Sequence, residues 1–129
     1  MKHDIESFLQ TLAKQWGAIG TLKITQTILD KGNPDANKSI QSFALAMGID
    51  FASLPKGGRN GVKIEGRFSC SGKPCKINFY RANGRGDYRL SITGLKHHAK
   101  AGDTIAIHYD IITGAIVVNA TKETGVSNG

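Results

Sequence analysis

The side chains best suited to recognition chemistry lie in one short stretch, residues 80–89, which reads Tyr-Arg-Ala-Asn-Gly-Arg-Gly-Asp-Tyr-Arg. Arginine can bond bidentately to guanine, asparagine can bond to adenine, and aspartate can accept a hydrogen bond from cytosine. The glycines at 84 and 86 lie between two alternating segments and predict a hairpin, and a two-stranded ribbon fits the DNA major groove. This stretch alone leaves open the alternative of a solvated hairpin whose charges bind nothing. Its candidate residues are Arg81, Asn83, Arg85, Asp87 and Arg89.

Positive charge is concentrated around this stretch. Residues 56–100 hold eleven lysines and arginines against two acids, a net charge of +9, whereas the rest of the chain has a net charge of −2. A basic face attracts polyanions, meaning nucleic acid or an anionic membrane surface. Simple solubility is the other explanation of this charge, so composition alone indicates only some polyanion.

A second polar segment lies upstream and also carries side chains that can bond to bases or phosphates. Taken alone, it has the composition of an ordinary turn-rich connection. Two such segments on one barrel could grip a groove from either side. The members of this segment are Lys31, Asn33, Asn37, Lys38 and Ser39.

Nothing in the chain positively indicates a catalytic or metal centre. There is no phosphate-binding glycine loop before a helix and no His-Glu-x-x-His motif. A two-metal nuclease needs clustered carboxylates, but the ten acids are scattered. Serine or cysteine triads form only in space, and no pattern suggests one. We therefore predict no enzyme, no catalytic residue, no cofactor and no metal.

The two cysteines, Cys70 and Cys75, are expected to be free thiols. A zinc site would need two more ligands, and the adjacent histidines at 97 and 98 rarely point at one ion. No apolar run approaches the roughly 18 residues that span a membrane. The first residues lack the apolar segment of a secretory signal, so we expect a cytoplasmic protein without membrane contact.

The elements that must position the candidate residues are mainly strands. Alternating β-branched and apolar residues predict seven of them, at 21–28, 39–42, 62–68, 75–81, 88–92, 103–109 and 112–119. Helical spacing of apolar residues predicts an amphipathic helix at 4–16 and a short helix at 43–48. The expected fold is mainly β with two or three short helices, a barrel or a sandwich. One domain would cover residues 1–119, and residues 120–129 would form a flexible tail.

The order of these elements resembles the plant B-three transcription-factor domain. Residues 88–95, Tyr-Arg-Leu-Ser-Ile-Thr-Gly-Leu, then a basic connection and Lys-Ala-Gly-Asp-Thr-Ile-Ala-Ile at 100–107, look like its second half. Residues 76–81 are similar to the strand before its recognition arm, and residues 22–48 to its first arm and following helix. The opening helix and the arginine-rich arm look more like the recognition domains of EcoRII-type and BfiI-type restriction endonucleases.

The resemblance covers roughly residues 20–110 and implies an open seven-stranded pseudobarrel whose two arms enter the major groove of double-stranded DNA. By position, the first arm is residues 25–39 and the second is residues 81–89. Base contacts would come first from the second arm and then from the polar residues of the first. Lysines are expected to contact phosphates, because a flexible point charge positions DNA without reading sequence. These lysines are Lys23, Lys63, Lys73, Lys76 and Lys96.

The predicted function is therefore sequence-specific duplex-DNA binding, as the non-catalytic recognition domain of a restriction endonuclease. The catalytic nuclease domain would lie in the same chain or in another. The alternatives are a stand-alone transcriptional or phage DNA-binding protein, an RNA- or single-strand-binding β-barrel, and a compact nuclease in its own right.

Overall fold

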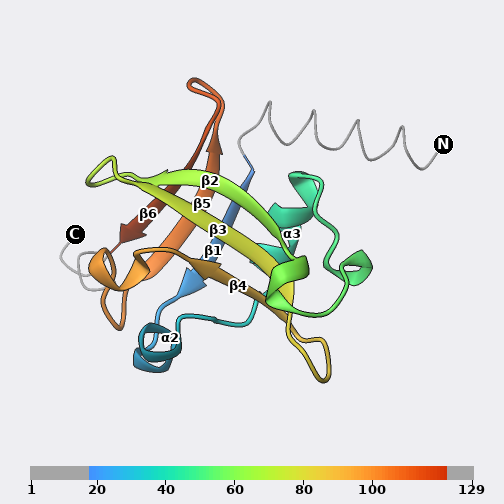
Figure 1. Cartoon of the computed structure of the whole chain (residues 1–129). Coiled ribbons are helices and arrows are strands. Elements are labelled where there is room, and N and C mark those ends of the chain that lie inside the picture. The colour runs from blue at the N-terminus through green and yellow to red at the C-terminus, as the bar shows by residue number, and fades with distance from the viewer. Residues whose placement is uncertain (1–17, 122–129) are drawn as a thin grey trace.

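The computed structural model describes residues 18–121 of the 129-residue chain (Figure 1). The helix predicted at 4–16 lies outside the described residues, as do residues 122–129 of the predicted tail. The first two residues of that tail, Ala120 and Thr121, belong to the last strand instead.

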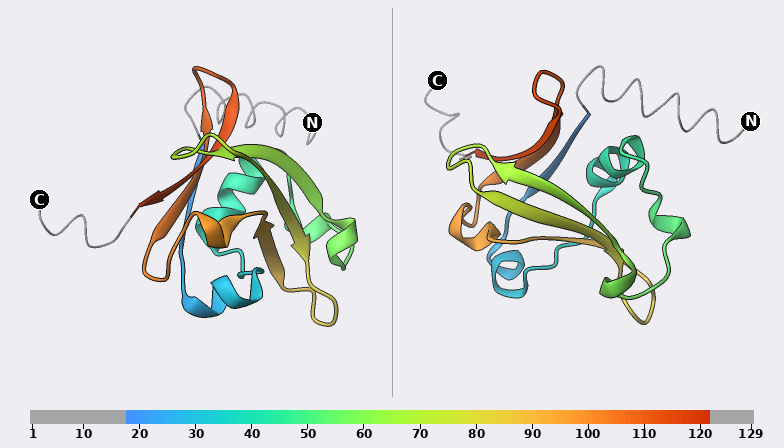
Figure 2. Two further views of the ribbon diagram at one scale, coloured as in Figure 1. Left: turned by 60° about the vertical axis from the view of Figure 1, so that its left-hand side comes forward. Right: turned by 45° about the horizontal axis from the view of Figure 1, so that its top comes forward.

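The described part is mainly β, with six strands in one curled half-barrel sheet (Figures 1 and 2). The sheet order is β1-β5-β6-β2-β3-β4, so β1 and β4 are its two edge strands. Neighbouring strands are antiparallel except β2 and β6, which pair in parallel over two residue pairs. The strands are β1 (Ile19–Lys23), β2 (Val62–Phe68), β3 (Pro74–Arg81), β4 (Tyr88–Ile92), β5 (Thr104–Asp110) and β6 (Ala115–Thr121).

Five of the seven predicted strands are confirmed within a few residues. Those at 62–68 and 88–92 have the predicted bounds, β3 begins one residue earlier than predicted, and β5 begins and ends one residue later. The strand predicted at 112–119 begins later, at Ala115, because a turn occupies the preceding residues. In that turn the Asp110 carboxylate accepts a hydrogen bond from the Ile112 N–H at 2.9 Å.

The strand predicted at 21–28 is wrong in its second half. It ends as β1 at Lys23, and helix α2 (Gln26–Lys31) follows. Thr25 is the N-cap of α2, since its hydroxyl accepts from the Ile28 N–H at 3.2 Å, and Gly32 ends the helix with φ 74°. A β-branched residue at the cap position imitates strand composition, which explains the error.

The strand predicted at 39–42 is also wrong, and a single helix, α3 (Lys38–Ala46), replaces it and the short helix at 43–48. The Asn37 side chain caps α3 by accepting from the Ile40 N–H at 2.9 Å. Ile40, Phe43 and Ala44 recur at helical spacing and are all buried. The described residues therefore form six strands, one fewer than predicted.

The core lies inside the curl of the sheet, where α3 packs against β1 (Figure 2). The close approach depends on Gly20, because a Cβ there would lie 2.9 Å from the Cβ of Phe43. Three 3₁₀ turns complete the described chain, at Phe51–Ser53 (η1), Gly58–Asn60 (η2) and Leu95–His97 (η3). None of the described helices is long and apolar enough to span a lipid bilayer.

Candidate nucleic-acid interface

The predicted second arm is a β-hairpin formed by β3 and β4. The two strands pair up to Arg81 opposite Tyr88, and the Ala82 N–H then donates to the Asp87 carbonyl at 2.8 Å. The turn closes through Gly84 and Gly86, whose φ angles of 77° and 78° lie in the left-handed region that glycine adopts without strain. The predicted ribbon is therefore confirmed.

The start of β4, next to the hairpin turn, is hydrogen-bonded to the first arm. The Ala36 N–H donates to the Tyr88 carbonyl at 2.9 Å, and the Leu90 N–H donates to the Pro34 carbonyl at 3.1 Å. These bonds make Asp35 and Arg89 an antiparallel bridge pair. The two arms, far apart in sequence, are consequently one hydrogen-bonded unit.

The same segment also reaches the other edge of the sheet. The Asn37 side-chain amide donates to the Thr21 carbonyl at 3.0 Å, and the Ser39 hydroxyl accepts from the Thr21 N–H at 2.9 Å. Residues 34–39 thus link the edge strands β4 and β1. In Figure 1 helix α2 and the turn of the β3–β4 hairpin both lie in the lower part of the molecule, α2 at the left and the turn at the right.

Opposite the first arm, residues of the loop before β2 support the hairpin. The Gly57 N–H donates to the Arg81 carbonyl at 2.7 Å, and the Lys56 ammonium donates to the Gly84 carbonyl at 2.7 Å. In the sequence, Lys56 is one member of the basic segment 56–100 and has no predicted role at the hairpin. Its bond to the turn depends on contact between residues 28 positions apart, and no pattern in the sequence signals it.

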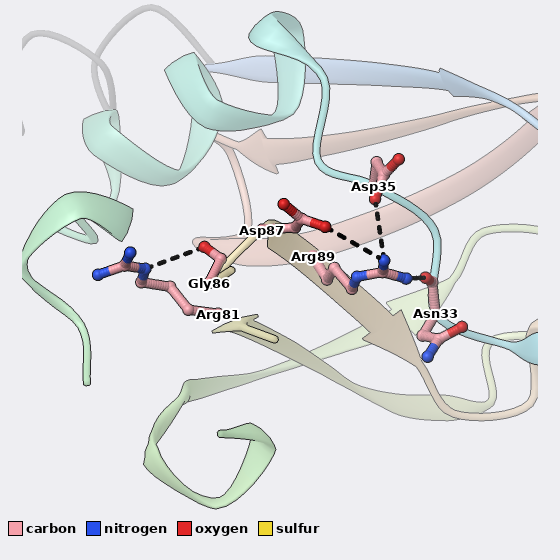
Figure 3. Close-up of polar contacts among 6 residues, drawn as sticks. All are labelled: Asn33, Asp35, Arg81, Gly86, Asp87 and Arg89. Atoms are coloured by element: carbon pink, nitrogen blue, oxygen red, sulfur yellow. Dashed lines mark hydrogen bonds and ion pairs between the residues drawn. The ribbon is translucent and has the colours of Figure 1, made fainter. Parts of the chain in front are cut away.

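Arg81 uses its guanidinium inside the hairpin. Its Nε–H donates to the Gly86 carbonyl at 3.0 Å (Figure 3). An Nη donates to the Leu54 carbonyl at 3.4 Å. The guanidinium carbon lies 5.8 Å from the centroid of the Tyr88 ring, which stacks on Phe51 with centroids 5.0 Å apart. Arg81 is therefore half-buried and anchored to the core through these aromatic rings.

Arg89 connects both arms. One Nη donates to the Asn33 carbonyl at 3.2 Å, while the other lies 3.7 Å from the Asp35 carboxylate and 3.6 Å from the Asp87 carboxylate (Figure 3). The Arg89 side chain is 29% exposed, and its Nε is buried with no hydrogen-bond acceptor among residues 18–121. Asp87, predicted to contact a base, thus faces an arginine of its own hairpin.

Asn83 and Arg85 differ from the two anchored arginines. Both are exposed in the turn of the hairpin, and neither side chain forms a hydrogen bond or ion pair within residues 18–121. Their donors and acceptors face solvent, so they are available to a ligand.

The first-arm residues divide in the same way. Asn37 and Ser39 are occupied in capping α3 and in bonding to β1, as described above. Lys31 and Lys38 are exposed, and Asn33 is half-buried with its carbonyl on Arg89. Lys31 and Asn33 line a hollow of about 320 Å³ together with Arg89, beside the hairpin base.

The predicted phosphate-contacting lysines do not all lie near the arms. Lys96 and Lys31 line a second hollow of about 250 Å³ between α2 and η3. Lys63 and Lys76 are exposed on the outer face of β2 and β3, and Lys23 is exposed on β1. Lys73 lies in the turn at the opposite end of β3 from the second arm. The structure therefore brings Lys31 and Lys96 together but separates Lys73 from the arms.

The cysteines and histidines form no metal-binding group within the described residues. Cys70 is exposed and Cys75 is buried, both as free thiols as predicted, and burial raises the pKa of the Cys75 thiol. His98 stacks on Phe68 with centroids 3.7 Å apart, and its ring nitrogens contact Ser71 and the Gly94 carbonyl. These contacts give His98 a packing role.

Comparison with protein-family models, with curated proteins and with solved structures finds no match to this chain. The resemblance to the B-three and restriction-endonuclease recognition domains therefore stays a prediction.

Proposed function

We propose that this protein binds double-stranded DNA in a sequence-specific manner, with the β3–β4 hairpin as its reading element in the major groove. The observation that carries this proposal is the direct hydrogen bonding of the two polar arms, beside which the Asn83 and Arg85 side chains of the hairpin turn are exposed. A two-stranded ribbon has the width to enter the major groove, and its exposed side chains meet the base edges there.

Within this function we assign base reading chiefly to Asn83 and Arg85. Both side chains are exposed and form no hydrogen bond in the described part of the chain, and their types match adenine and guanine. Arg81 and Arg89 are assigned to supporting the arms, since a base contact would cost each of them its existing internal bonds. This divides the five residues that the sequence alone treated as one set.

Phosphate contacts fall to the exposed lysines beside the arms, with Lys31, Lys38 and Lys96 first. Such contacts position the duplex and supply the salt-sensitive part of the affinity. Lys63, Lys76 and Lys23 lie on the sheet and would extend the contact only if the duplex follows the outer face of β2 and β3 or reaches β1.

The finer description of the fold belongs to the same proposal. We propose that the half-barrel, whose two edge strands both bond to residues 34–39, is an open pseudobarrel. We further propose a cytoplasmic recognition domain of a restriction endonuclease, whose cleavage chemistry resides in another domain or chain.

The test is selection from a random duplex library, followed by titration of the enriched duplex with the parent protein. We expect one enriched motif and an affinity whose logarithm falls with log salt by about 0.9 per phosphate neutralised. Arg85→Ala should weaken specific binding by about 1–3 kcal/mol and relax preference at one base pair.

Arg67→Ala is the matched control. It removes the same charge from an exposed arginine that lies opposite Pro74, at the far end of β3 from Arg81, roughly 23 Å away at about 3.3 Å per residue. The control should keep the parent's sequence preference. Failure to enrich any motif, preferred binding of single strands, or magnesium-dependent cleavage by this chain would each contradict the proposed function.

A further inference from the structure

We propose that Arg89 is a positioning residue that holds the two arms at a preset separation, so that they contact the DNA as one rigid unit. The inference rests on the proposed function for its consequence at DNA. Its structural core, that the Arg89 guanidinium keeps the first arm on the second, stands on the contacts within the protein.

The guanidinium is bonded to both arms at once. Asn33 and Asp35 approach it from the first arm, and Asp87 approaches it from the hairpin (Figure 3). One Nη lies within 4 Å of the carboxylates of both Asp35 and Asp87. Removing the guanidinium would leave these two acids facing each other without a cation, and like charges at short range repel.

The backbone around Arg89 explains why this one side chain governs the junction. Asp35 and Arg89 are the bridge pair, and the two inter-arm backbone bonds flank them, Ala36 to Tyr88 on one side and Leu90 to Pro34 on the other. This makes them a non-hydrogen-bonded antiparallel pair, the arrangement in which opposite side chains lie closest.

The geometry also requires arginine in particular. A planar guanidinium offers donors in several fixed directions, whereas a lysine ammonium is a single point charge on a flexible stem. In Arg89 the two Nη groups point to different partners, and Nε is buried without an acceptor. A bidentate contact to guanine would break these bonds, so Arg89 acts through the arms and not on a base.

A preset separation matters for recognition because ordering flexible segments on binding consumes interaction free energy. When the arms are already joined, the exposed side chains of the hairpin turn reach base edges in a register that the first arm defines. Loosening the junction should therefore lower discrimination between sites more than it lowers general affinity for duplex DNA.

The first experiment needs no DNA. Amide hydrogen exchange of Ala36 and Leu90, the two donors of the inter-arm bonds, is measured by NMR in the parent, Arg89→Lys and Asp35→Asn proteins. We expect exchange about 10-fold faster in Arg89→Lys, which keeps the charge but not the fork, and about 3-fold faster in Asp35→Asn, whose carboxylate is largely exposed.

Asp30→Asn is the matched control, because it makes the same change on α2, where Asp30 accepts from Gln26 and does not touch Arg89. It should leave both amides unchanged. The Ile77 amide in the buried part of β3 serves as reference, and its exchange should not change in any variant. Parent-like exchange at Ala36 and Leu90 in both junction variants would overturn the inference.

The second experiment compares binding to the selected duplex and to a scrambled duplex. We expect Arg89→Lys to lower the ratio of specific to non-specific affinity about 10-fold, and Asp35→Asn about 3-fold. If Arg89 instead reads a base, Asp35→Asn should free it and raise the ratio, which would refute the positioning role. Absence of duplex binding in the parent would refute the proposed function but leave the exchange result standing.

Discussion

The same substitution at two arginines of the β3–β4 hairpin should affect different properties of the protein. Arg81→Met should destabilise the fold, and Arg85→Met should weaken DNA binding while leaving the fold intact. Both changes remove one guanidinium and keep an unbranched apolar stem, so they form a matched pair.

The magnitude for Arg81 follows from its contacts. The 3.0 Å bond from its charged Nε–H to the Gly86 carbonyl is worth about 1.5–3 kcal/mol. The 3.4 Å contact to the Leu54 carbonyl is long and adds little, and the position over the Tyr88 ring adds about 0.5–1 kcal/mol. Because methionine retains the stem packing, only these two contributions are lost, and we expect the free energy of unfolding to fall by about 2–4 kcal/mol.

Arg85 is exposed and forms no hydrogen bond or ion pair with the residues that the structure describes, so its substitution should change stability by less than about 0.5 kcal/mol. Its loss should appear in specific binding, at about 1–3 kcal/mol, which is roughly 5-fold to 150-fold in affinity. The duplex is the motif enriched by selection.

Urea denaturation followed by circular dichroism measures the first quantity, with the slope checked for constancy so that the midpoint reports stability. Fluorescence anisotropy with labelled duplex measures the second. The reasoning is refuted if Arg81→Met unfolds at the parent's midpoint, or if Arg85→Met loses as much stability as Arg81→Met.

Three further predictions concern the turns and the core. Gly86→Ala should lower the free energy of unfolding more than Gly84→Ala in urea denaturation. Both force a left-handed φ on alanine, at about 1–2 kcal/mol. Only at Gly86 would the new Cβ meet the Arg81 guanidinium, at 2.5 Å, whereas a Cβ at residue 84 would have no neighbour within 4 Å among the described residues; equal losses would contradict the packing of the turn. Hydrogen bonds from the Ile112 N–H and from the following threonine lower the pKa of the Asp110 carboxyl. The stabilisation of the folded state by this carboxylate is therefore present above the ordinary aspartate pKa and is lost as the pH falls through the lowered pKa. Asp110→Asn should flatten the dependence of the free energy of unfolding on pH over that acidic range, and an unchanged dependence would argue against the turn. Phe79→Ala should cost about 3–5 kcal/mol by calorimetry, because the ring is fully buried between two other phenylalanines; a loss below 1 kcal/mol would mean that the core is not centred there.

The strands from residue 62 onward could be predicted because each buries one face of its pleat. In β3, Cys75, Ile77 and Phe79 are buried while Lys76 is exposed, which is the period-two pattern in its simplest form. The hairpin turn could be predicted equally well, since glycine at 84 and 86 adopts the left-handed φ angles that the turn requires.

The segment between residues 21 and 48 could not be predicted in the same way. Thr25 and Ile28 fit the composition of a strand, and only the capping bond between them shows that a helix begins there. The same holds for Asn37, whose bond to the Ile40 N–H starts α3. Cap bonds and strand propensity use the same residue types, so composition does not separate them.

By itself, then, the sequence determined a mainly β chain, a basic half and a glycine-closed hairpin rich in arginine, because strand alternation, turn angles and charge are local properties. Only the tertiary structure decided which arginines of the hairpin form internal bonds and which is exposed. Arg89 and its Asn33 partner are 56 residues apart, and Arg81 reaches Leu54 from 27 residues away. Such pairings depend on which segments the folded sheet brings side by side, and no local pattern records them.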